Sequence, residues 1–276
     1  MKRFFYIIAI YLLASIIATE LITNSDISRL IKVQGHEIRT AERKSRQHTA
    51  KKVRKLILGD STGCGLYPAW HSYNNIVSLA CNQAISMAGQ YFLLKNYLEA
   101  NSDNLPQEIV LLCNAGIFSN DLDEFAYHYF LKPFPVWRYK KLYTAHLYER
   151  VESIPLYWTA YLPFVHASRF TPEESVPEIE SEMQVSEIAY EYLLLIDSLT
   201  QSYNIPLKCV ATPIREDRKH FTEKICQNIE NASPEQLKYL FKQYNKSITS
   251  YPADYFQDNA HLKKQYIPHD YLGILD

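Results

Sequence analysis

The chain is poor in glycine, with only 7 among 276 residues, and three of these, Gly59, Gly63 and Gly65, lie close together. No Gly-x-Gly-x-x-Gly segment follows an apolar run, so nothing in the sequence indicates a dinucleotide-binding Rossmann fold. An excess of positive charge is also lacking, because 29 Lys and Arg residues face 30 Asp and Glu residues. A near-neutral chain has no broad electrostatic footprint for nucleic acid, and we expect no nucleic-acid partner.

Cysteine and histidine usage excludes two further classes of protein. The five cysteines are odd in number and form no Cys-x-x-Cys pair, which argues against a complete disulfide framework and against a zinc site. The nine histidines are scattered without His-Glu-x-x-His spacing, so we expect neither a metal nor a cofactor. Cys64 lies close to Ser61, but no basic residue beside it would lower its pKa, and we expect it to pack in the core.

The first residues predict a membrane anchor or an export signal. Lys2 and Arg3 precede an apolar run from Phe4 to Ala18, and the next charged residue is Glu20. We favour a retained single-pass anchor over residues 1–20, with its basic end in the cytoplasm and the rest of the chain in the periplasm or outside the cell. A cleaved signal peptide of a secreted protein, or a buried N-terminal helix of a cytosolic one, are the alternatives. Residues 21–54 are interpreted as a stalk helix over 19–35 and a basic linker over 36–54.

The remainder, residues 55–276, has the pattern of one α/β domain. Short apolar runs at 55–60, 75–80, 108–115 and 206–212 are typical of buried parallel strands. Helical stretches near 89–101 and 183–204 separate them. Alternating strands and helices predict a flavodoxin-like three-layer α/β/α fold with a mostly parallel sheet, in which the C-terminal ends of the strands share one edge.

An insertion at about 118–182 separates the third and fourth predicted strands. It is rich in aromatic residues and is broken by prolines into short helices. One interpretation is a cap or substrate platform over the active edge of the sheet. The other is a helical subdomain with a small core of its own.

Ser61 follows the first predicted strand directly, and such a position presents a hydroxyl at the edge of the sheet where ligands bind. A serine hydroxyl is a poor nucleophile unless a base, oriented by a third group, accepts its proton. Asp258 and His261, three residues apart near the C-terminus, can supply both. We therefore predict a Ser61–His261–Asp258 triad. Arg215, after the fourth strand, could contact an anionic substrate, but a salt bridge with Glu216 or Asp217 is favoured.

This pattern resembles the SGNH/GDSL hydrolase superfamily. Gly59-Asp60-Ser61, with Gly65 four residues after the serine, matches the first motif of the superfamily, and Asp258-x-x-His261 matches the last. In these proteins a glycine and an asparagine between the two motifs donate hydrogen bonds to the oxyanion. The resemblance implies Gly89 for the glycine, with Asn82 as an alternative donor, and Asn114 or Asn120 for the asparagine.

The middle of the chain contains no Gly-x-Asn-Asp motif, and in this it resembles the membrane-anchored O-acyltransferase-like branch of the superfamily. The resemblance implies an esterase or O-acyltransferase that acts on an acyl ester of a cell-envelope polysaccharide. It also implies a multi-pass membrane acyltransferase as partner. The alternative function is a non-catalytic accessory protein of the same fold that binds glycan or such a membrane partner.

Overall fold

The computed structural model describes residues 2–23, 25, 27, 35–122, 127–162 and 185–273. Its main sheet has the parallel strand order β2-β1-β3-β4. The strands are β1 (Lys55–Gly59), β2 (Ile76–Ser78), β3 (Glu108–Cys113) and β4 (Leu207–Ala211), and β5 (Ile214–Arg215) pairs with β6 (Ser250–Tyr251) in a separate small sheet. All four strands that the apolar runs predict are present, and their C-terminal ends share one edge because every pairing is parallel.

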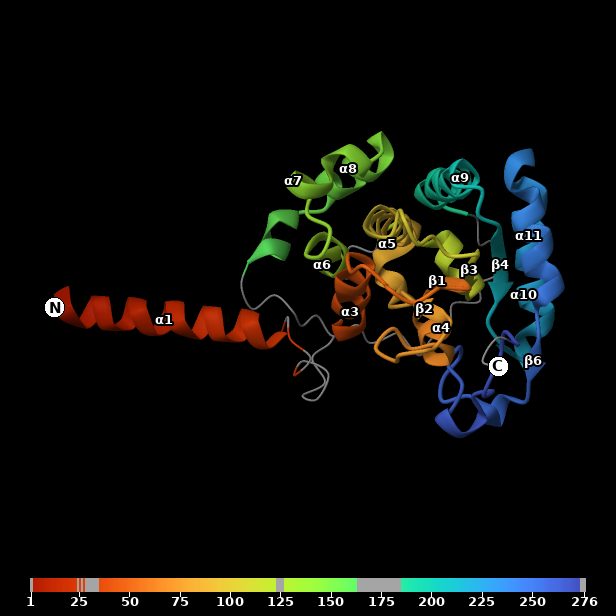
Figure 1. Cartoon of the computed structure of the whole chain (residues 1–276), viewed down its shortest axis with the longest axis horizontal. Helices are drawn as coiled ribbons and strands as arrows, with labels where there is room; N and C mark the ends of the chain where they lie inside the picture. Colours follow the sequence, from red (N-terminus) through yellow and green to blue (C-terminus); the bar gives the residue numbers. More distant parts are fainter. Residues whose placement is uncertain are drawn as a thin grey trace.

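Helices cover the sheet, form the insertion outside it and extend from the domain at its N-terminus (Figure 1). They are α1 (Lys2–Thr23), α3 (His36–Ser45), α4 (Ser61–Leu66), α5 (Ser86–Ala100), α6 (Tyr127–Leu131), α7 (Val136–Tyr139), α8 (Ala145–Ser153), α9 (Glu187–Ser202), α10 (Lys219–Ala232) and α11 (Glu235–Ser247). Short 3₁₀ turns complete them: η1 (Gln83–Ile85), η2 (Ala115–Ser119), η3 (Lys140–Leu142), η4 (Tyr157–Tyr161), η6 (Glu216–Arg218), η7 (Ala253–Tyr255) and η8 (Lys264–Tyr266).

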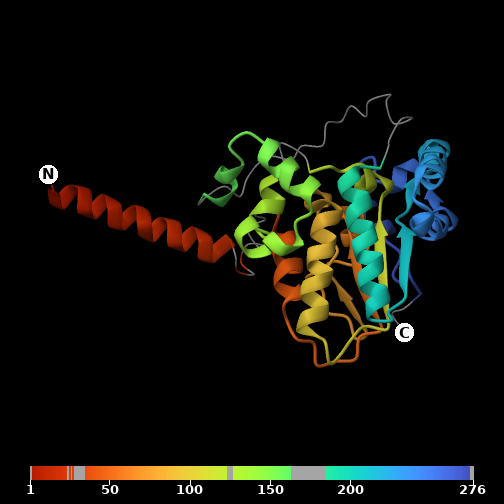
Figure 2. The ribbon, with the colours of Figure 1, turned by 90° about the horizontal axis from the view of Figure 1, so that it is seen from above.

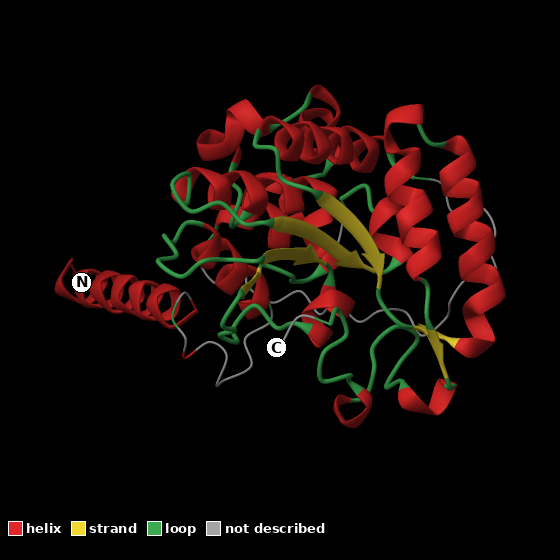
Figure 3. Cartoon of the chain, turned by 45° about the vertical axis from the view of Figure 1, so that its right-hand side comes forward, coloured by secondary structure: helices red, strands yellow, loops and turns green. Residues whose placement is uncertain are grey.

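The two faces of the sheet bury alternate residues of each strand. Leu56 and Leu58 of β1 belong to the large core that α3, α5 and α9 cover, whereas Ile57 points to the opposite face. That second face is thinner, and α4 and the C-terminal segment cover it with Tyr67 and Tyr271 among the contacting side chains. Figure 3 shows the strands lying between these two layers. The chain therefore has the predicted α/β fold with a parallel sheet covered on both faces.

The basic segment 36–54 is not a simple linker, in contrast to the prediction. Its first ten residues form α3, which packs against α5 and buries Ile38 and Ala41 completely or nearly so. Lys44 then donates to the carbonyl of Ala69 at 2.9 Å. The helix was not apparent from the sequence because most of its residues are charged or polar. Ile38, Ala41 and the aliphatic stems of the charged side chains are sufficient to cover the side of α5. The globular domain thus begins near Gly35 rather than at residue 55.

The described part of the insertion packs on the outer surface of α5 and α9 (Figure 2). Its aromatic rings surround Phe92 of α5, with ring centroids 5.2–5.7 Å away; they belong to Phe130, Phe134, Tyr139 and Tyr143. This cluster joins the described part of the insertion to the large core of the domain, so these residues have no separate core of their own. The remaining positions of the insertion, residues 123–126 and 163–182, lie outside the described residues.

The N-terminal apolar helix is present as predicted. α1 extends away from the domain in Figures 1 and 2, and its 21 residues from Lys2 to Ile22 are long and apolar enough to cross a membrane, with none of them buried. Such a helix is compatible with a signal anchor or a signal peptide. The predicted stalk helix over 19–35 coincides with α1 as far as Thr23, and most of its remaining residues lie outside the described ones.

Candidate active site

The buried carboxylate of Asp60 organises the turn that carries Ser61. Asp60 is the N-cap of α4, and its Oδ1 accepts hydrogen bonds from the backbone N–H groups of Thr62 at 2.9 Å and Gly63 at 3.2 Å. Its Oδ2 accepts from the N–H of Asn114 at 2.8 Å, which links the ends of β1 and β3. Burial raises the pKa of Asp60, and these hydrogen bonds oppose that shift. Ser61 is consequently held at the first position of α4, at the C-terminal edge of the sheet.

Two glycines allow this turn to lie against β3. A Cβ atom at Gly59 would lie 1.9 Å from the carbonyl oxygen of Leu112, and one at Gly63 would lie 2.2 Å from the same atom. Any larger residue at either position would displace the backbone on one side of Ser61. No such demand exists at Gly65, where an added Cβ would meet nothing. Close approach to β3 therefore explains two of the three clustered glycines.

The end of β1 is also held from the helical side by Gln90. This fully buried residue of α5 accepts a hydrogen bond from the N–H of Gly59 at 3.0 Å and donates to its carbonyl at 2.9 Å. The same carbonyl also accepts from the N–H of Cys81 at 3.0 Å, so Gln90 adds to the backbone hydrogen bonds at the end of β1. No sequence motif predicts the role of Gln90, which only the packing of α5 against β1 shows.

The Asp258–His261 segment is a closed loop rather than the start of a helix. The N–H of Gln257 donates to the carbonyl of His261 at 2.9 Å, and Phe256 pairs with Leu262 in an antiparallel bridge. Asp258 Oδ1 accepts from the N–H groups of Ala260 at 2.8 Å and His261 at 2.7 Å. Among the described residues after this loop, only the short turn η8 forms.

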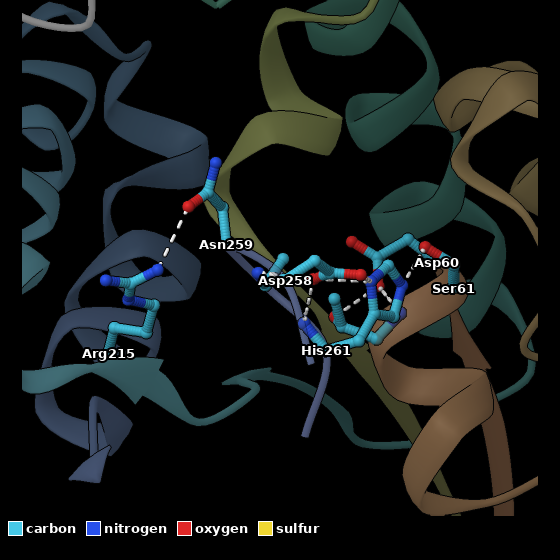
Figure 4. A network of polar contacts seen from close by, with 8 residues as sticks. Asp60, Ser61, Arg215, Asp258, Asn259 and His261 are labelled. Atoms are coloured by element: carbon cyan, nitrogen blue, oxygen red, sulfur yellow. Dashed lines mark hydrogen bonds and ion pairs between the residues drawn. The ribbon is translucent and has the colours of Figure 1, made fainter. Parts of the chain in front are cut away.

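The structure brings Ser61, His261 and Asp258 together from the two ends of the domain (Figure 4). The Nε2 atom of His261 lies 2.9 Å from Ser61 Oγ, and its Nδ1 atom lies 2.9 Å from Asp258 Oδ2. Both distances are within hydrogen-bond range, so one imidazole can bridge the hydroxyl and the carboxylate. The side chains of His261 and Asp258 are 31% and 47% exposed, which leaves the group open to solvent.

The carboxylate of Asp258 is suited to orient an imidazole. Its partial burial opposes ionisation, but the two backbone N–H donors and the imidazole outweigh that effect and lower the pKa of Asp258. The side chain is therefore ionised at neutral pH. An ionised carboxylate on Nδ1 favours the tautomer in which Nε2 is unprotonated and able to accept the proton of Ser61.

Arg215 supports this loop from β5. Its Nε and Nη2 donate to the two carboxylate oxygens of Asp217, at 3.0 and 2.6 Å, which confirms the favoured salt bridge. Its Nη1 donates in addition to Asn259 Oδ1 at 3.1 Å, beside Asp258 (Figure 4). Arg215 is thus a positioning residue for the loop that carries His261.

The predicted oxyanion donor Gly89 lies in the first turn of α5, beside Gln90, whose side chain contacts the end of β1. It is the fourth residue of α5. A Cβ atom at this position would lie 2.5 Å from the side chain of Ile85, so close packing explains the glycine. That Gly89 donates to an oxyanion stays a prediction. The only sequence signal for the prediction at Gly89 was the presence of a glycine in the middle of the chain.

The two asparagines predicted as donors differ in their surroundings. Asn120 uses its amide nitrogen to donate to the carbonyl of Gln83 at 2.7 Å, and so connects two loops. Asn114 accepts a hydrogen bond from the N–H of Gly116 at 3.0 Å through its side-chain oxygen. The Nδ2 atom of Asn114 takes no part in that hydrogen bond. Asn114 lies one residue beyond β3, and its backbone N–H donates to Asp60 Oδ2. Asn82, the alternative, caps η1 by accepting from the N–H of Ala84.

Gly59, Ser61 and Gly63 also have the spacing Gly-x-Ser-x-Gly, which is typical of the nucleophile turn of α/β-hydrolases. In that turn the N–H of the residue after the serine binds the oxyanion. Here this N–H belongs to Thr62 and donates to Asp60 Oδ1. The amide of Ser61 has no partner among the described residues and is the one that the turn leaves available. The local geometry therefore differs from that of an α/β-hydrolase.

Two cavities flank the serine and histidine. The larger, about 690 Å³, is bounded by Ser61, Leu66 and Tyr67 on one side and by Lys264 and Ile267 on the other. Its aromatic wall consists of Tyr67, Trp70, His71 and Tyr73. The smaller, about 210 Å³, contains His261 together with Thr62 and Thr212. No described residue of the aromatic insertion lines either cavity, so these residues do not form a cap over Ser61.

Other nucleophiles and metal ligands near the serine are excluded by their surroundings. Cys64 is buried, and burial raises the pKa of its thiol to about 12, as expected for a packing residue. Among the described residues no group of three or more His, Cys, Asp or Glu side chains could hold a metal ion. The hydroxyl, the imidazole and the carboxylate are the groups that the geometry brings together here.

Comparisons with known proteins add little to this geometry. No family model matches the chain, and no curated protein matches it. A solved structure from Streptococcus pneumonia, described as a platelet activating factor, is similar over 90% of this chain and 91% of its own, with 16% sequence identity and a TM-score of 0.39.

Proposed function

We propose that the chain is a serine-dependent enzyme of the SGNH type that cleaves or transfers an acyl ester. The observation that carries the proposal is the continuous contact from Asp258 through His261 to Ser61, with 2.9 Å on each side of the imidazole. These are the three groups that acyl transfer through serine requires, in the order nucleophile, base and orienting carboxylate. The serine also lies at the edge of a parallel sheet where substrates bind in open α/β folds.

In the proposed mechanism Ser61 Oγ attacks the carbonyl carbon of the ester while His261 Nε2 accepts the hydroxyl proton. The carbonyl becomes a tetrahedral oxyanion, and its collapse breaks the bond to the alcohol, which leaves with the proton from His261. Water or a second alcohol then attacks the acyl-serine, and His261 accepts its proton. Release of the acid or new ester returns that proton to Ser61. Asp258 stabilises the imidazolium formed in each half.

The oxyanion requires hydrogen-bond donors that are in place before the reaction. The amide of Ser61 and the side-chain nitrogen of Asn114 are the donors we propose. Asp60 fixes both, because it caps the helix that begins with Ser61 and accepts from the backbone N–H of Asn114 at 2.8 Å.

A glycan ester fits the larger cavity. Trp70 and Tyr73 provide aromatic faces beside Ser61, and aromatic faces with polar edges suit the mixed apolar and hydroxylated surface of a sugar ring. We propose that the acyl group is carried by, or transferred to, a cell-envelope polysaccharide. Hydrolysis and transfer differ only in whether water or a sugar hydroxyl attacks the acyl-serine.

The location we propose is the outer side of the cytoplasmic membrane, with α1 as a retained anchor. Its 22 residues span about 33 Å at 1.5 Å per residue, which matches a hydrocarbon core of about 30 Å. Lys2 and Arg3 at its start favour a cytoplasmic N-terminus. A multi-pass acyltransferase in the same membrane is the partner proposed for the transfer reaction.

Labelling with a fluorophosphonate tests the triad directly. The full-length protein in detergent micelles is expected to label covalently, and Ser61→Ala is expected to abolish the label. His261→Gln should slow labelling by roughly 10³-fold or more, because the serine then lacks its base. Ser72→Ala, at an exposed serine, is the matched control and should label like the wild type. A folded protein that never labels would favour the non-catalytic accessory function instead.

A further inference from the structure

The aromatic wall of the larger cavity belongs to the loop between α4 and β2, over residues 67–75. This loop places Trp70 beside the cavity that Ser61 lines. Within the loop, which the structure describes in full, a single backbone–backbone hydrogen bond forms, from the N–H of His71 to the carbonyl of Pro68 at 3.0 Å. A loop with so few internal hydrogen bonds depends on contacts from other elements to keep one conformation.

Lys44 of α3 supplies such contacts. Its Nζ atom donates to the carbonyl of Ala69 at 2.9 Å and to the carbonyl of His71 at 3.3 Å. These two carbonyls lie on either side of Trp70 in the chain, and Figure 1 shows this loop next to α3. One amino group therefore holds the backbone both before and after the indole.

The side chain of Trp70 also contacts α3 directly. The ring centroid of His36, the first residue of that helix, lies 5.1 Å from the centroid of the indole, at an interplanar angle of 43°. Glu37, the next residue, lines the larger cavity together with Trp70. α3 thus supports the loop with residues near both of its ends, and this helix, which the sequence did not predict, forms part of the surroundings of Ser61.

The position of Lys44 is costly for a charged group. Burial lowers the pKa of Lys44 to about 8, and no carboxylate among the described residues opposes that shift. Because this value lies above 7, the amino group still carries its charge at neutral pH. Hydrogen bonds from a charged donor are stronger than those from a neutral one, so the bonds to Ala69 and His71 offset part of the desolvation of the amino group.

We propose that Lys44 is a positioning residue for the substrate. By holding the carbonyls of Ala69 and His71, it keeps one face of Trp70 against the larger cavity, where the sugar ring of a glycan ester stacks. Lys44 lines neither cavity beside the triad, so it acts through the loop and not by contact with substrate. The inference rests on the proposed function and assigns to α3 a part in choosing which esters bind, while the triad cleaves them.

The first test compares KM for a bulky and a small ester, with the full-length protein in detergent micelles. Lys44→Met removes both hydrogen bonds and keeps an unbranched side chain. For acetylated xylotriose KM should rise about three- to tenfold, because the released indole no longer presents one face to the sugar. The kcat for this substrate, and both constants for methyl acetate, should stay as in the wild type. Lys242→Met, at an exposed position of α11, is the matched control and should change neither KM.

Three further variants relate the effect to charge and to Trp70. Lys44→Arg restores a charged donor and should recover most of the affinity, whereas Lys44→Gln supplies a neutral donor and should give an intermediate KM. Lys44→Met combined with Trp70→Ala should be no worse than Trp70→Ala alone, because both changes act on the same indole. An unchanged KM in Lys44→Gln and Lys44→Met, an equal rise for both esters, or additive effects in the double variant would overturn the proposal.

The second test follows Trp70 itself and needs no turnover. The chain has three tryptophans, so Trp137→Phe with Trp158→Phe leaves Trp70 alone to fluoresce. Addition of Lys44→Met to this background should increase quenching by acrylamide and shift the emission to longer wavelength, because the released indole is more exposed to water. Xylotriose should protect Trp70 from acrylamide, and protect it less after Lys44→Met. Equal quenching with and without Lys44→Met contradicts the proposed support of the loop.

Fluorophosphonate labelling of Ser61 separates the two proposals. Lys44→Met should label like the wild type, since the substitution does not touch the triad. Normal labelling with unchanged quenching would overturn the role of Lys44 alone. A wild type that does not label would overturn the proposed function and with it the substrate role of Lys44, and increased quenching would then report only that α3 holds the loop. The two failures are therefore distinguishable.

Discussion

The N–H group of Asn114 donates to the Oδ2 atom of Asp60 at 2.8 Å, so one buried carboxylate joins the ends of two neighbouring strands. The same carboxylate caps the helix that begins with Ser61. Asp60 therefore positions the proposed nucleophile without contacting substrate. The role of Asp60 in the Gly-Asp-Ser motif is therefore structural and does not involve proton transfer.

Asp60→Asn is expected to destabilise the protein. The new amide group would face the N–H of Asn114, so that one buried donor loses its acceptor, at a cost of about 1–3 kcal/mol in the free energy of unfolding. Denaturant unfolding in detergent measures this change. Asp254→Asn makes the same chemical change at an exposed site and should leave stability unaltered. Equal stability of the two variants would contradict the role assigned to Asp60.

The pH dependence of stability should reveal Asp258. Because its pKa is lower in the folded than in the unfolded protein, the folded state binds fewer protons, and the ionised carboxylate stabilises the fold above the ordinary Asp value of about 3.9. This contribution disappears as the pH falls below that value and through the folded pKa. The difference in Tm between wild type and Asp258→Asn should therefore shrink from neutral pH to about pH 3. A difference that grows on acidification would contradict the assignment.

Arg215→Ala should lower kcat and leave KM nearly unchanged, since the guanidinium contacts Asn259 in the loop rather than the cavities at Ser61. Loss of one such hydrogen bond predicts a decrease in kcat of about three- to tenfold. Asn259→Ala should have a similar effect, and the double variant should be no worse than either single one. Lys219→Ala, on the neighbouring exposed surface, is the control. A large rise in KM for Arg215→Ala would indicate substrate contact instead.

Trp70→Ala should weaken the binding of bulky substrates selectively. If a sugar ring stacks in the larger cavity, loss of the indole face predicts a rise in KM of about three- to tenfold for a glycan ester. Methyl acetate does not extend to this wall, and its KM should not change. Trp137→Ala, outside the cavity, serves as the control for general destabilisation. Identical effects on both substrates would argue against a sugar site at Trp70.

The predictable parts of this protein are local. Four apolar runs of six to eight residues correspond to the four strands of the main sheet because a strand buried on both faces needs a mostly apolar segment. The apolar run after Lys2 and Arg3 likewise corresponds to α1. Ser61 was identifiable because a polar turn follows a strand directly. In each case the decisive information lies within a few neighbouring residues.

The parts that could not be predicted depend on partners distant in sequence. α3 is concealed by its charges, and only contact with α5 shows which side of it is buried. Gly89 resembles an oxyanion glycine in its order along the chain, and only the structure shows that Ile85 packs against it. Gln90 and Arg215 support the site through contacts 31 and 44 residues away.

The sequence by itself determined the residue types of the proposed triad and the parallel α/β framework, because hydrophobic patterning and local turn chemistry act over short stretches of chain. Only the tertiary structure decided that His261 lies 2.9 Å from Ser61, which is 200 residues away. It alone also placed α3 beside the loop of Trp70 and the aromatic insertion away from Ser61. Such juxtapositions arise from the packing of whole elements against one another, and no single segment encodes them.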